Sequence, residues 1–223
     1  MQFEQQAWAQ GYACVAGVDE VGRGALFGPV VAAAVVLDPH DRIRGLNDSK
    51  QLAPEVREKL DRAIRQRALA WAVAAADAAC IDAINILQAS RRAMLEAVEG
   101  LGLRPDCLLV DAVPLDWPGP QQALIRGDAR SISIAAASIV AKVFRDALLR
   151  RWDPIFPAFH LASNKGYGSP HHLAALERCG PTPLHRRSFA PVGGAALALQ
   201  PGFAWPEEQV TLTGGTRWPV AES

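Results

Sequence analysis

The sequence has no excess of either charge and no long hydrophobic segment. Its 223 residues contain 23 Lys and Arg against 23 Asp and Glu, so the formal net charge is zero. This balance argues against indiscriminate binding to nucleic acid, although it is compatible with a local basic groove. Apolar runs such as residues 30–37 are far shorter than the roughly 18 residues that a membrane span needs. The amino end, MQFEQQAWAQ, has no Lys or Arg, so we expect no signal or transit peptide, no membrane contact and a soluble, cytoplasmic protein.

Cysteine is scarce, and the motifs of two common catalytic classes are missing. The four cysteines lie far apart in the sequence, at Cys14, Cys80, Cys107 and Cys179. This spacing favours reduced core thiols over a disulfide framework or a CxxC metal site. No GxSxG segment indicates a serine nucleophile. Cys179 also has no recognised zinc-ligand spacing with His172 and His185.

The first strand expected from the sequence ends on two carboxylates. Residues 14–18 are small and apolar enough for a buried strand, and Asp19 and Glu20 follow directly. Glycines flank Arg23 in residues 22–24, so the backbone there can adopt positive φ and approach a ligand closely. Neighbouring side chains on a strand face opposite ways, so we expect the strand to end or bulge at the acids. We interpret the stretch as a metal-binding strand end beside a cradle for an anionic substrate, with a solvated turn as the alternative.

Alternating strand and helix patterns follow along the chain. We expect strands over residues 29–37 and 70–79, and helices over residues 54–68, 86–101 and 132–152. The strand at 29–37 follows the first strand so closely that an antiparallel hairpin is expected. The helix at 132–152 begins with small side chains, which allow its first turns to pack closely against a sheet.

The helix at 54–68 has two candidate caps. Asp48 or Ser49 is expected to cap it, with Val56 on its buried face. Lys50 then lies near a helix amino end, where a phosphate could be held. An ordinary capped surface helix is the alternative.

Two further carboxylates follow apolar strand-like segments. Asp111 ends the run CLLVDA, and Asp128 ends ALIRGD. In sheets with crossover helices, sites assemble at the edge where strands end, so Asp19, Asp111 and Asp128 are expected to meet there. Asp146 is a further candidate ligand, or the partner of a nearby cation in a structural ion pair.

Glycine and basic residues gather near the carboxyl end. Lys165 and Tyr167 are expected to be exposed in a Gly-rich turn, where Tyr167 could stack on a sugar or base, or simply anchor the loop. The basic cluster HRRSF at residues 185–189 could contact a phosphodiester backbone. We expect one domain over residues 1–192 and a loosely ordered tail over 193–223.

Taken in order, these motifs resemble ribonuclease HII, the type 2 ribonuclease H family. The matching segments cover about residues 12 to 192 and comprise GVDEVGRGALFGPVVAAAVVL, NDSKQL, Asn85 in AINIL, LLVDA, IRGDARSISIAAASIVAKVFRD, NKGYGS with His172, and HRRSFAPV. The resemblance implies an α/β ribonuclease H-like fold, in which a mixed central sheet carries helices on both faces. The departures from the family pattern are Ala112, Asn164 and Ser169, of which the last two bear on fine specificity.

The resemblance also implies roles for individual residues. The four active-site acids map onto Asp19, Glu20, Asp111 and Asp128, which are expected to hold two divalent ions, Mg²⁺ or Mn²⁺. The family motif that lies against the ribonucleotide 2′-hydroxyl maps onto Gly22, Arg23 and Gly24, and its stacking tyrosine onto Tyr167. Further substrate contacts are expected from Ser49, Lys50, Lys165 and Arg187.

The expected activity is endonucleolytic. The resemblance predicts hydrolysis of the RNA strand of RNA–DNA hybrids and cleavage 5′ to ribonucleotides in duplex DNA, leaving 3′-hydroxyl and 5′-phosphate ends. A resolvase-like nuclease of the same fold and a hybrid-binding module that does not cut are the alternatives. We expect a monomer, and no sliding-clamp contact through Gln209 and Leu212, because the aromatic residues of a clamp peptide are missing.

Overall fold

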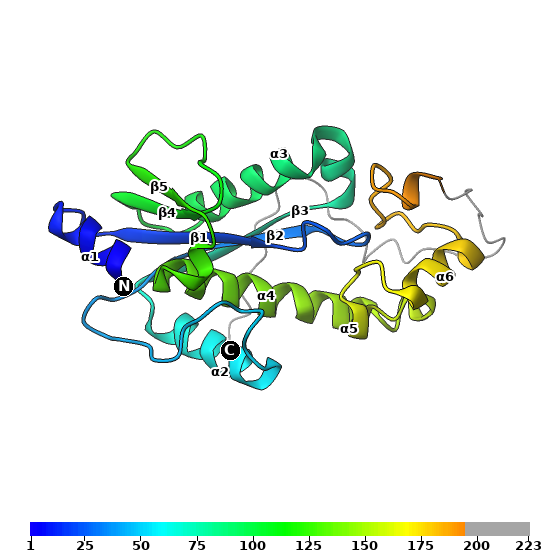
Figure 1. Ribbon diagram of the computed structural model, residues 1–223, viewed down its shortest axis with the longest axis horizontal. Helices are drawn as coiled ribbons and strands as arrows, with labels where there is room; N and C mark the ends of the chain where they lie inside the picture. The colour runs from blue at the N-terminus through cyan, green and yellow to red at the C-terminus, as the bar shows by residue number, and fades with distance from the viewer. Residues whose placement is uncertain (195–223) are drawn as a thin grey trace. The chain divides into compact units, whose positions relative to one another are not determined.

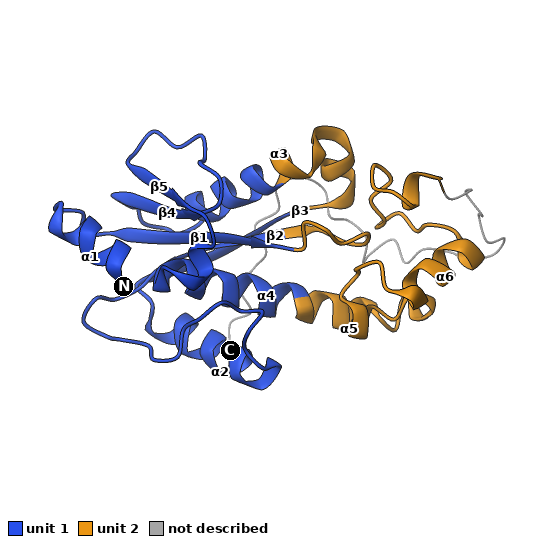
Figure 2. Ribbon diagram, in the orientation of Figure 1, with its two compact units in different colours: residues 1–21, 31–75, 90–145 blue, residues 22–30, 76–89, 146–223 orange. Residues whose placement is uncertain are grey.

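The computed structural model describes residues 1–194. The predicted tail over residues 193–223 therefore lies, apart from Gly193 and Gly194, outside the described residues. The chain forms two compact units (Figure 2). Unit 1 contains residues 1–21, 31–75 and 90–145, and unit 2 contains residues 22–30, 76–89 and, of the described residues, 146–194.

Unit 1 is built on a five-stranded mixed sheet (Figure 1). Its strands are β1 (Val15–Val21), β2 (Val30–Val36), β3 (Ala70–Ala76), β4 (Cys107–Asp111) and β5 (Gln121–Leu124). Their order is β3-β2-β1-β4-β5, with β1 antiparallel to β2, and β4 parallel to both β1 and β5. The hairpin predicted between the first two strands is confirmed. Both of these strands are buried along most of their length, which explains their apolar composition.

Helices cover both faces of this sheet, as the resemblance implies (Figure 1). The helices are α1 (Gln2–Ala9), α2 (Pro54–Arg67), α3 (Ala78–Glu99) and α4 (Ile132–Trp152). Leu60 and Ile64 of α2 pack with β2 and with the small residues of α4 in one buried cluster. Residues 90–99 of α3 lie on the other side, where Met94 and Val98 are buried. Among the described helices, none is long and apolar enough to cross a membrane.

The start of α4 lies directly against β1. A Cβ placed on Gly17 would overlap the backbone of Ser133 and Ile134. The side chain of Glu4 accepts hydrogen bonds from the hydroxyl of Ser131 and, at 3.1 Å, from the backbone N–H of Ser133. The start of α4 is thus held by two contacts. One is its close packing against Gly17 of β1, and the other is the hydrogen bonding to the buried carboxylate of Glu4 in α1.

Several local predictions are wrong. Helix α2 has Ala53 at its N-cap with no side-chain cap, so neither Asp48 nor Ser49 caps it, and Val56 is 45% exposed. Leu87, which the helical spacing of residues 86–101 predicts on a buried face, is also exposed, because α3 begins earlier than predicted and is broken at Asn85 (φ 66°). The carbonyl oxygen of the Asn85 side chain accepts from the backbone N–H of Gln88 at 3.1 Å, which caps the second half of the helix.

Unit 2 has a separate hydrophobic core. Its elements include η2 (Pro157–Phe159), α5 (Leu161–Asn164), α6 (Pro170–Cys179) and η3 (Val192–Gly194), together with the carboxyl end of α4. Phe27 lies at the centre of this core, with its ring 5.3 Å from that of Phe156 and 6.0 Å from that of Trp152. The segment around Phe27 is bonded to two others, because Leu26 N–H donates to Gly166 O (2.8 Å) and Arg186 N–H donates to Leu26 O (2.9 Å).

Candidate active site

Asp19 and Glu20 lie inside β1, not at its end. Strand β1 stays in unbroken register with β2 as far as Val21, whereas its pairing with β4 stops at the pair Val18 and Val110. The expected strand end or bulge is therefore wrong. The two acids occupy the part of β1 that lies beyond its pairing with β4.

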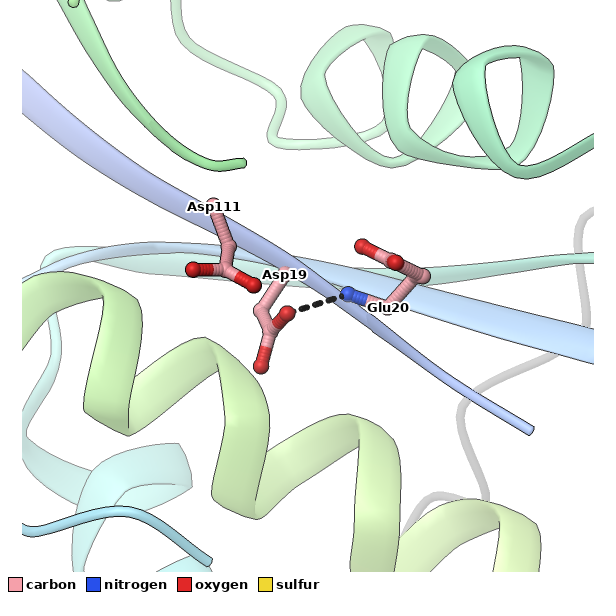
Figure 3. Close-up of side chains that lie close together, drawn as sticks. All are labelled: Asp19, Glu20 and Asp111. Carbon is pink, nitrogen blue, oxygen red and sulfur yellow. Dashed lines mark hydrogen bonds between the residues drawn. The ribbon is translucent and has the colours of Figure 1, made fainter. Parts of the chain in front are cut away.

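Asp111 comes from that neighbouring strand, and three carboxylates meet (Figure 3). One ligand atom from each of Asp19, Glu20 and Asp111 lies within 4.8 Å of the others. Figure 3 shows the carboxylates of Asp19 and Glu20 on different sides of β1, with Asp111 beside Asp19. Asp111 is oriented by the backbone N–H of Gly127, which donates to Oδ1 at 2.6 Å. The cluster is therefore built from two strands and a turn that follows β5.

The local electrostatics oppose the charged forms of Asp19 and Asp111. Burial, together with the charges of Glu20 and Asp111, raises the pKa of Asp19 well above its usual range. Burial also raises the pKa of Asp111, against the opposing effect of the Gly127 hydrogen bond. Crowded carboxylates of this kind are stabilised by a cation placed among them.

Two serines form a hydrogen-bonded chain that ends on Asp19. The Ser138 side chain of α4 hydrogen-bonds to Asp19, and the hydroxyls of Ser49 and Ser138 lie 2.9 Å apart. When Asp19 is ionised its carboxylate can only accept, so the Ser138 hydroxyl then donates to Asp19 and Ser49 donates to Ser138. Ser49 is 2% exposed. The structure thus places this predicted substrate contact in the network that orients Asp19.

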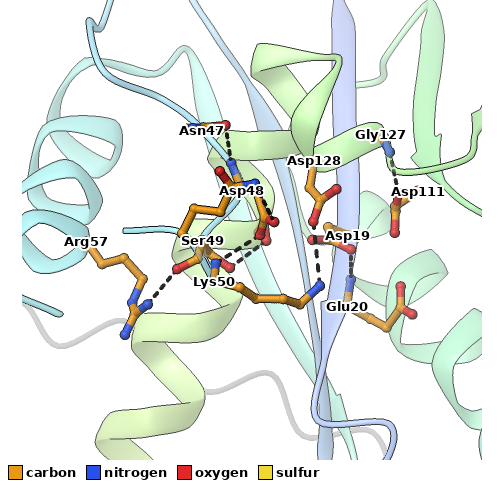
Figure 4. A network of polar contacts seen from close by, with 12 residues as sticks. Asp19, Glu20, Asn47, Asp48, Ser49, Lys50, Arg57, Asp111, Gly127 and Asp128 are labelled. Carbon is orange, nitrogen blue, oxygen red and sulfur yellow. Dashed lines mark hydrogen bonds and ion pairs between the residues drawn. The ribbon is translucent and has the colours of Figure 1, made fainter. Parts of the chain in front are cut away.

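Asp128, the fourth predicted acid, lies outside the close group (Figure 4). It does not follow a strand directly but lies on the short 3₁₀ helix η1 (Gly127–Ala129), because β5 ends at Leu124 and Arg126 turns the chain with φ 54°. Its carboxylate is buried and pairs with Lys50, whose Nζ lies 3.6 Å from Oδ2. Asp146, the further candidate ligand, is not in the close group either.

The other predicted substrate residues lie in unit 2. Residues 22–24 begin the segment that leads to Phe27, and Tyr167 lies in the turn after α5 with 39% of its surface exposed. A Cβ added to Gly24 would lie 3.9 Å from Cε1 of Tyr167, so the ring faces a residue without a side chain. Lys165 is half-buried, and its ammonium donates to the carbonyl of Ala162.

Comparison with known proteins matches this arrangement to one family. Residues 16–192 match the family model described as Ribonuclease HII. The Ribonuclease HII of Solibacter usitatus is 61% identical over 190 residues, which cover 85% of this chain and 83% of that protein. This chain belongs to the ribonuclease HII family. It is a metal-dependent endoribonuclease, a hydrolase of phosphodiester bonds.

Solved structures agree with this membership. The ribonuclease H2 from Pyrococcus horikoshii OT3 superposes with a TM-score of 0.69 at 28% identity, over 82% of this chain and 96% of that one. A structure of the PCNA:RNase HII complex from Archaeoglobus fulgidus gives a TM-score of 0.68 at 27% identity, over 79% and 95% of the two chains. The predicted α/β ribonuclease H-like fold is confirmed.

The structure corrects the interpretation of the basic cluster at residues 185–189. His185 and Arg186 are fully buried, so neither is placed to meet a phosphate backbone. Arg186 donates from Nε to Gly28 O (2.9 Å) and from Nη1 to Arg23 O (2.7 Å), which holds both ends of the Gly-rich segment. Only Arg187 of the three basic residues is exposed.

Sequence reasoning therefore missed some residues that act behind the site. Ser138 was visible only as one small residue among several at the start of a helix, and nothing local distinguishes it as a partner of Asp19. Arg186 was visible but was given an exposed position. The available signal for Arg186 is its position in the motif HRRSF, between a histidine and an aromatic residue. This signal does not distinguish a buried guanidinium from an exposed one.

Proposed function

We propose that this endoribonuclease cuts the RNA strand of RNA–DNA hybrids and also cuts on the 5′ side of a ribonucleotide embedded in duplex DNA. The products carry 3′-hydroxyl and 5′-phosphate ends. The observation that carries the proposal is the convergence of Asp19, Glu20 and Asp111 in a chain of the ribonuclease HII family. A close group of carboxylates suits phosphodiester hydrolysis assisted by metal ions.

The donor atoms fit hard divalent cations. The close group offers only carboxylate oxygens, which Mg²⁺ and Mn²⁺ prefer and which soft-metal sites lack. Asp19 and Asp111 are the central ligands in this proposal, and Glu20 and Asp128 complete the two positions. When bound, two such ions supply an activated water and offset the charge on the scissile phosphate.

Recognition of RNA depends on the 2′-hydroxyl, since this group distinguishes the two sugars. We assign that contact to the backbone of Gly22 and Gly24 and to Arg23, and stacking on the neighbouring deoxyribose to Tyr167. The bare Gly24 facing the Tyr167 ring supports this assignment, because a side chain there would occupy the surface that the sugar needs.

Cations around these groups would hold the phosphates. Lys50 is 77% exposed beside Asp128, and Arg187 is exposed with its backbone N–H bonded to Asp82 at 2.9 Å. Because both side chains are exposed, both can contact the phosphate backbone of a nucleic acid. Lys165 is the third candidate, and the buried Ser49 contributes through Asp19.

The decisive experiment uses end-labelled duplexes of one sequence. One duplex contains a single ribonucleotide, one has an all-RNA strand, one is all DNA, and a four-way junction tests the resolvase alternative. Each is incubated with Mg²⁺, Mn²⁺ or chelator. We expect cleavage of the first two only, with metal only, and products whose 3′ ends a polymerase extends and whose 5′ ends a phosphatase alters.

Matched variants separate cutting from binding. Asp19→Asn should abolish cleavage while leaving hybrid binding within about twofold, since one charge among several contacts is removed. Glu99→Gln, an exposed acid at the end of α3, serves as the control and should cleave normally. Binding without cleavage by the unaltered protein would instead indicate a hybrid-binding module, and cutting of the junction alone a resolvase-like nuclease.

The clamp prediction stays a prediction. The Archaeoglobus fulgidus relative is described in a complex with PCNA. In this chain the residues on which the prediction rests, Gln209 and Leu212, lie outside the described residues. We propose that the chain acts as a monomer without a clamp peptide, which a pull-down with a purified sliding clamp would test.

A further inference from the structure

Two buried histidines of unit 2 contact each other and do not belong to the acid cluster. The Nε2 atoms of His172 and His185 lie 3.0 Å apart. Nδ1 of His172 lies 3.0 Å from the carbonyl oxygen of Tyr167, and Nδ1 of His185 lies 3.0 Å from the backbone nitrogen of Thr182. Both rings are almost completely buried. A continuous chain of contacts therefore runs from Thr182 to the residue assigned to stack on the substrate.

The outer partners fix the direction of every hydrogen bond in this chain. The carbonyl of Tyr167 can only accept, so Nδ1 of His172 carries a hydrogen. The backbone N–H of Thr182 can only donate, so Nδ1 of His185 carries none. A neutral imidazole has one hydrogen, so Nε2 of His185 donates to Nε2 of His172. The two rings are in opposite tautomers.

The surroundings keep both rings neutral. Phe27 and Phe159 flank the pair, with the ring of His185 4.9 Å and 4.7 Å from theirs. Burial lowers the pKa of His172, and burial together with His172 lowers the pKa of His185 to about 3. At neutral pH the pair therefore carries no charge.

The chain of contacts ends at the carbonyl of Tyr167, which follows a turn with left-handed backbone conformations. Lys165 (φ 54°) and Gly166 (φ 79°), which precede Tyr167, both have left-handed conformations, and for Lys165 this is strained. The Tyr167 carbonyl accepts a second hydrogen bond from the backbone N–H of Ser169 at 2.8 Å. Both of its acceptor positions are thus used, and the contact with His172, five residues along the chain, is the one that continues to His185, a further 13 residues along the chain.

We propose that His172 and His185 are positioning residues, which form a neutral imidazole relay that fixes the Tyr167 backbone and so holds the Tyr167 ring against Gly24. The inference rests on the proposed function only in taking stacking by Tyr167 as the step that the relay serves. The relay acts through Tyr167, and neither histidine touches the substrate.

The tautomers are testable without any variant. Long-range ¹H–¹⁵N correlation spectra of the full chain at neutral pH should show His172 protonated at Nδ1 and His185 protonated at Nε2. Exposed His171 supplies the reference for a ring outside the buried pair. Equal tautomers in the two rings, or a protonated ring at neutral pH, would overturn the relay.

A double-mutant cycle tests the positioning role. His172→Asn keeps an N–H donor close to the Nδ1 position, whereas His172→Leu removes it at similar size. On the duplex with one ribonucleotide, we expect kcat/KM to fall roughly tenfold for His172→Leu and less than about threefold for His172→Asn. When Tyr167→Ala is already present, adding His172→Leu should lower kcat/KM further by less than about twofold. His171→Ala is the matched control and should change nothing.

The outcomes separate this proposal from the proposed function. Additive losses in the cycle, while the wild type still cuts 5′ to the ribonucleotide, would reject the relay and leave the function intact. Normal cleavage by Tyr167→Ala would reject both the relay and the stacking role, but not the acid cluster. If His172→Leu does not fold, His172→Gln takes its place in the cycle, since it keeps the polarity yet moves the donor away from the Tyr167 carbonyl.

Discussion

The ammonium of Lys50 lies 3.6 Å from the carboxylate of Asp128, the one predicted acid outside the close group (Figure 4). The two side chains differ sharply in exposure, at 77% for Lys50 and 9% for Asp128. Partial burial alone would lower the pKa of Lys50, but the nearby carboxylates of Asp128 and Asp19 outweigh this effect and raise it. An exposed lysine thus supplies positive charge to a buried acidic site, and a metal ion can displace it.

Removal of this charge should strengthen metal binding. In Lys50→Met the acids lose a competing cation, so we expect the Kd for Mn²⁺ without substrate to fall about three- to fivefold, or ~1 kcal/mol at most for so exposed a pair. Isothermal titration calorimetry measures this directly. Lys59→Met, on the exposed side of α2, should leave the Kd unchanged. A weaker Kd in Lys50→Met would show that the lysine does not compete with the ion.

Asp19→Asn should stabilise the protein while removing its activity. Neutralising a buried carboxylate among like charges removes repulsion, so in chelator the free energy of unfolding should rise by about 1 kcal/mol. Mg²⁺ should raise the melting temperature of the wild type but barely change that of the variant. Thermal unfolding of both proteins, with and without Mg²⁺, checks this. Destabilisation of the variant in chelator would mean that the hydrogen bonds to Asp19 outweigh the repulsion.

The parts of the fold that depend on local patterns could be predicted. The helix at 132–152 agrees in its bounds with α4, and the strand at 29–37 agrees with β2 within one residue at each end. The exposure of Val56 could not be predicted. Helical spacing indicates which face of a helix is apolar, but not how much of that face the rest of the protein covers. The bond between Glu4 and Ser131 spans 127 residues, and no short-range pattern carries such information.

The candidate site shows the same limit. Asp19, Glu20 and Asp111 were identifiable because each follows or interrupts an apolar run, a local property. The support that Ser138 gives to Asp19, and the buried position of Arg186, depend on contacts that only tertiary packing creates. Charge alone made Arg186 look exposed, although a guanidinium with carbonyl partners can be buried.

Gly17 should tolerate no side chain. Because an added Cβ would overlap the backbone of Ser133 and Ile134, Gly17→Ala must push the start of α4 away from β1. We expect a loss of about 3 kcal/mol or more in unfolding free energy, together with weaker metal binding as Ser138 moves with the helix. Urea denaturation measures the loss. Gly194→Ala, where a Cβ meets nothing within 4 Å, is the control and should change stability little.

The stability should fall in mild acid because of His185. This histidine has a pKa of about 3 in the folded protein, against an ordinary value of about 6.5 when unfolded. Below pH 6.5 the unfolded chain takes up a proton that the folded chain does not, so the unfolded state is favoured as pH falls toward 3. Between pH 7.5 and 5 this one group should remove about 2 kcal/mol of stability.

A comparison with His185→Gln isolates this contribution. Asp19, whose raised pKa acts in the opposite sense, titrates in both proteins and cancels in the difference. Urea denaturation at several pH values should therefore show the advantage of the wild type over His185→Gln shrinking by about 2 kcal/mol from pH 7.5 to 5. His171→Gln, which alters an exposed ring, should keep the wild-type pH dependence. Parallel curves for the wild type and His185→Gln would mean that His185 takes up its proton in the folded state, which the buried relay does not permit.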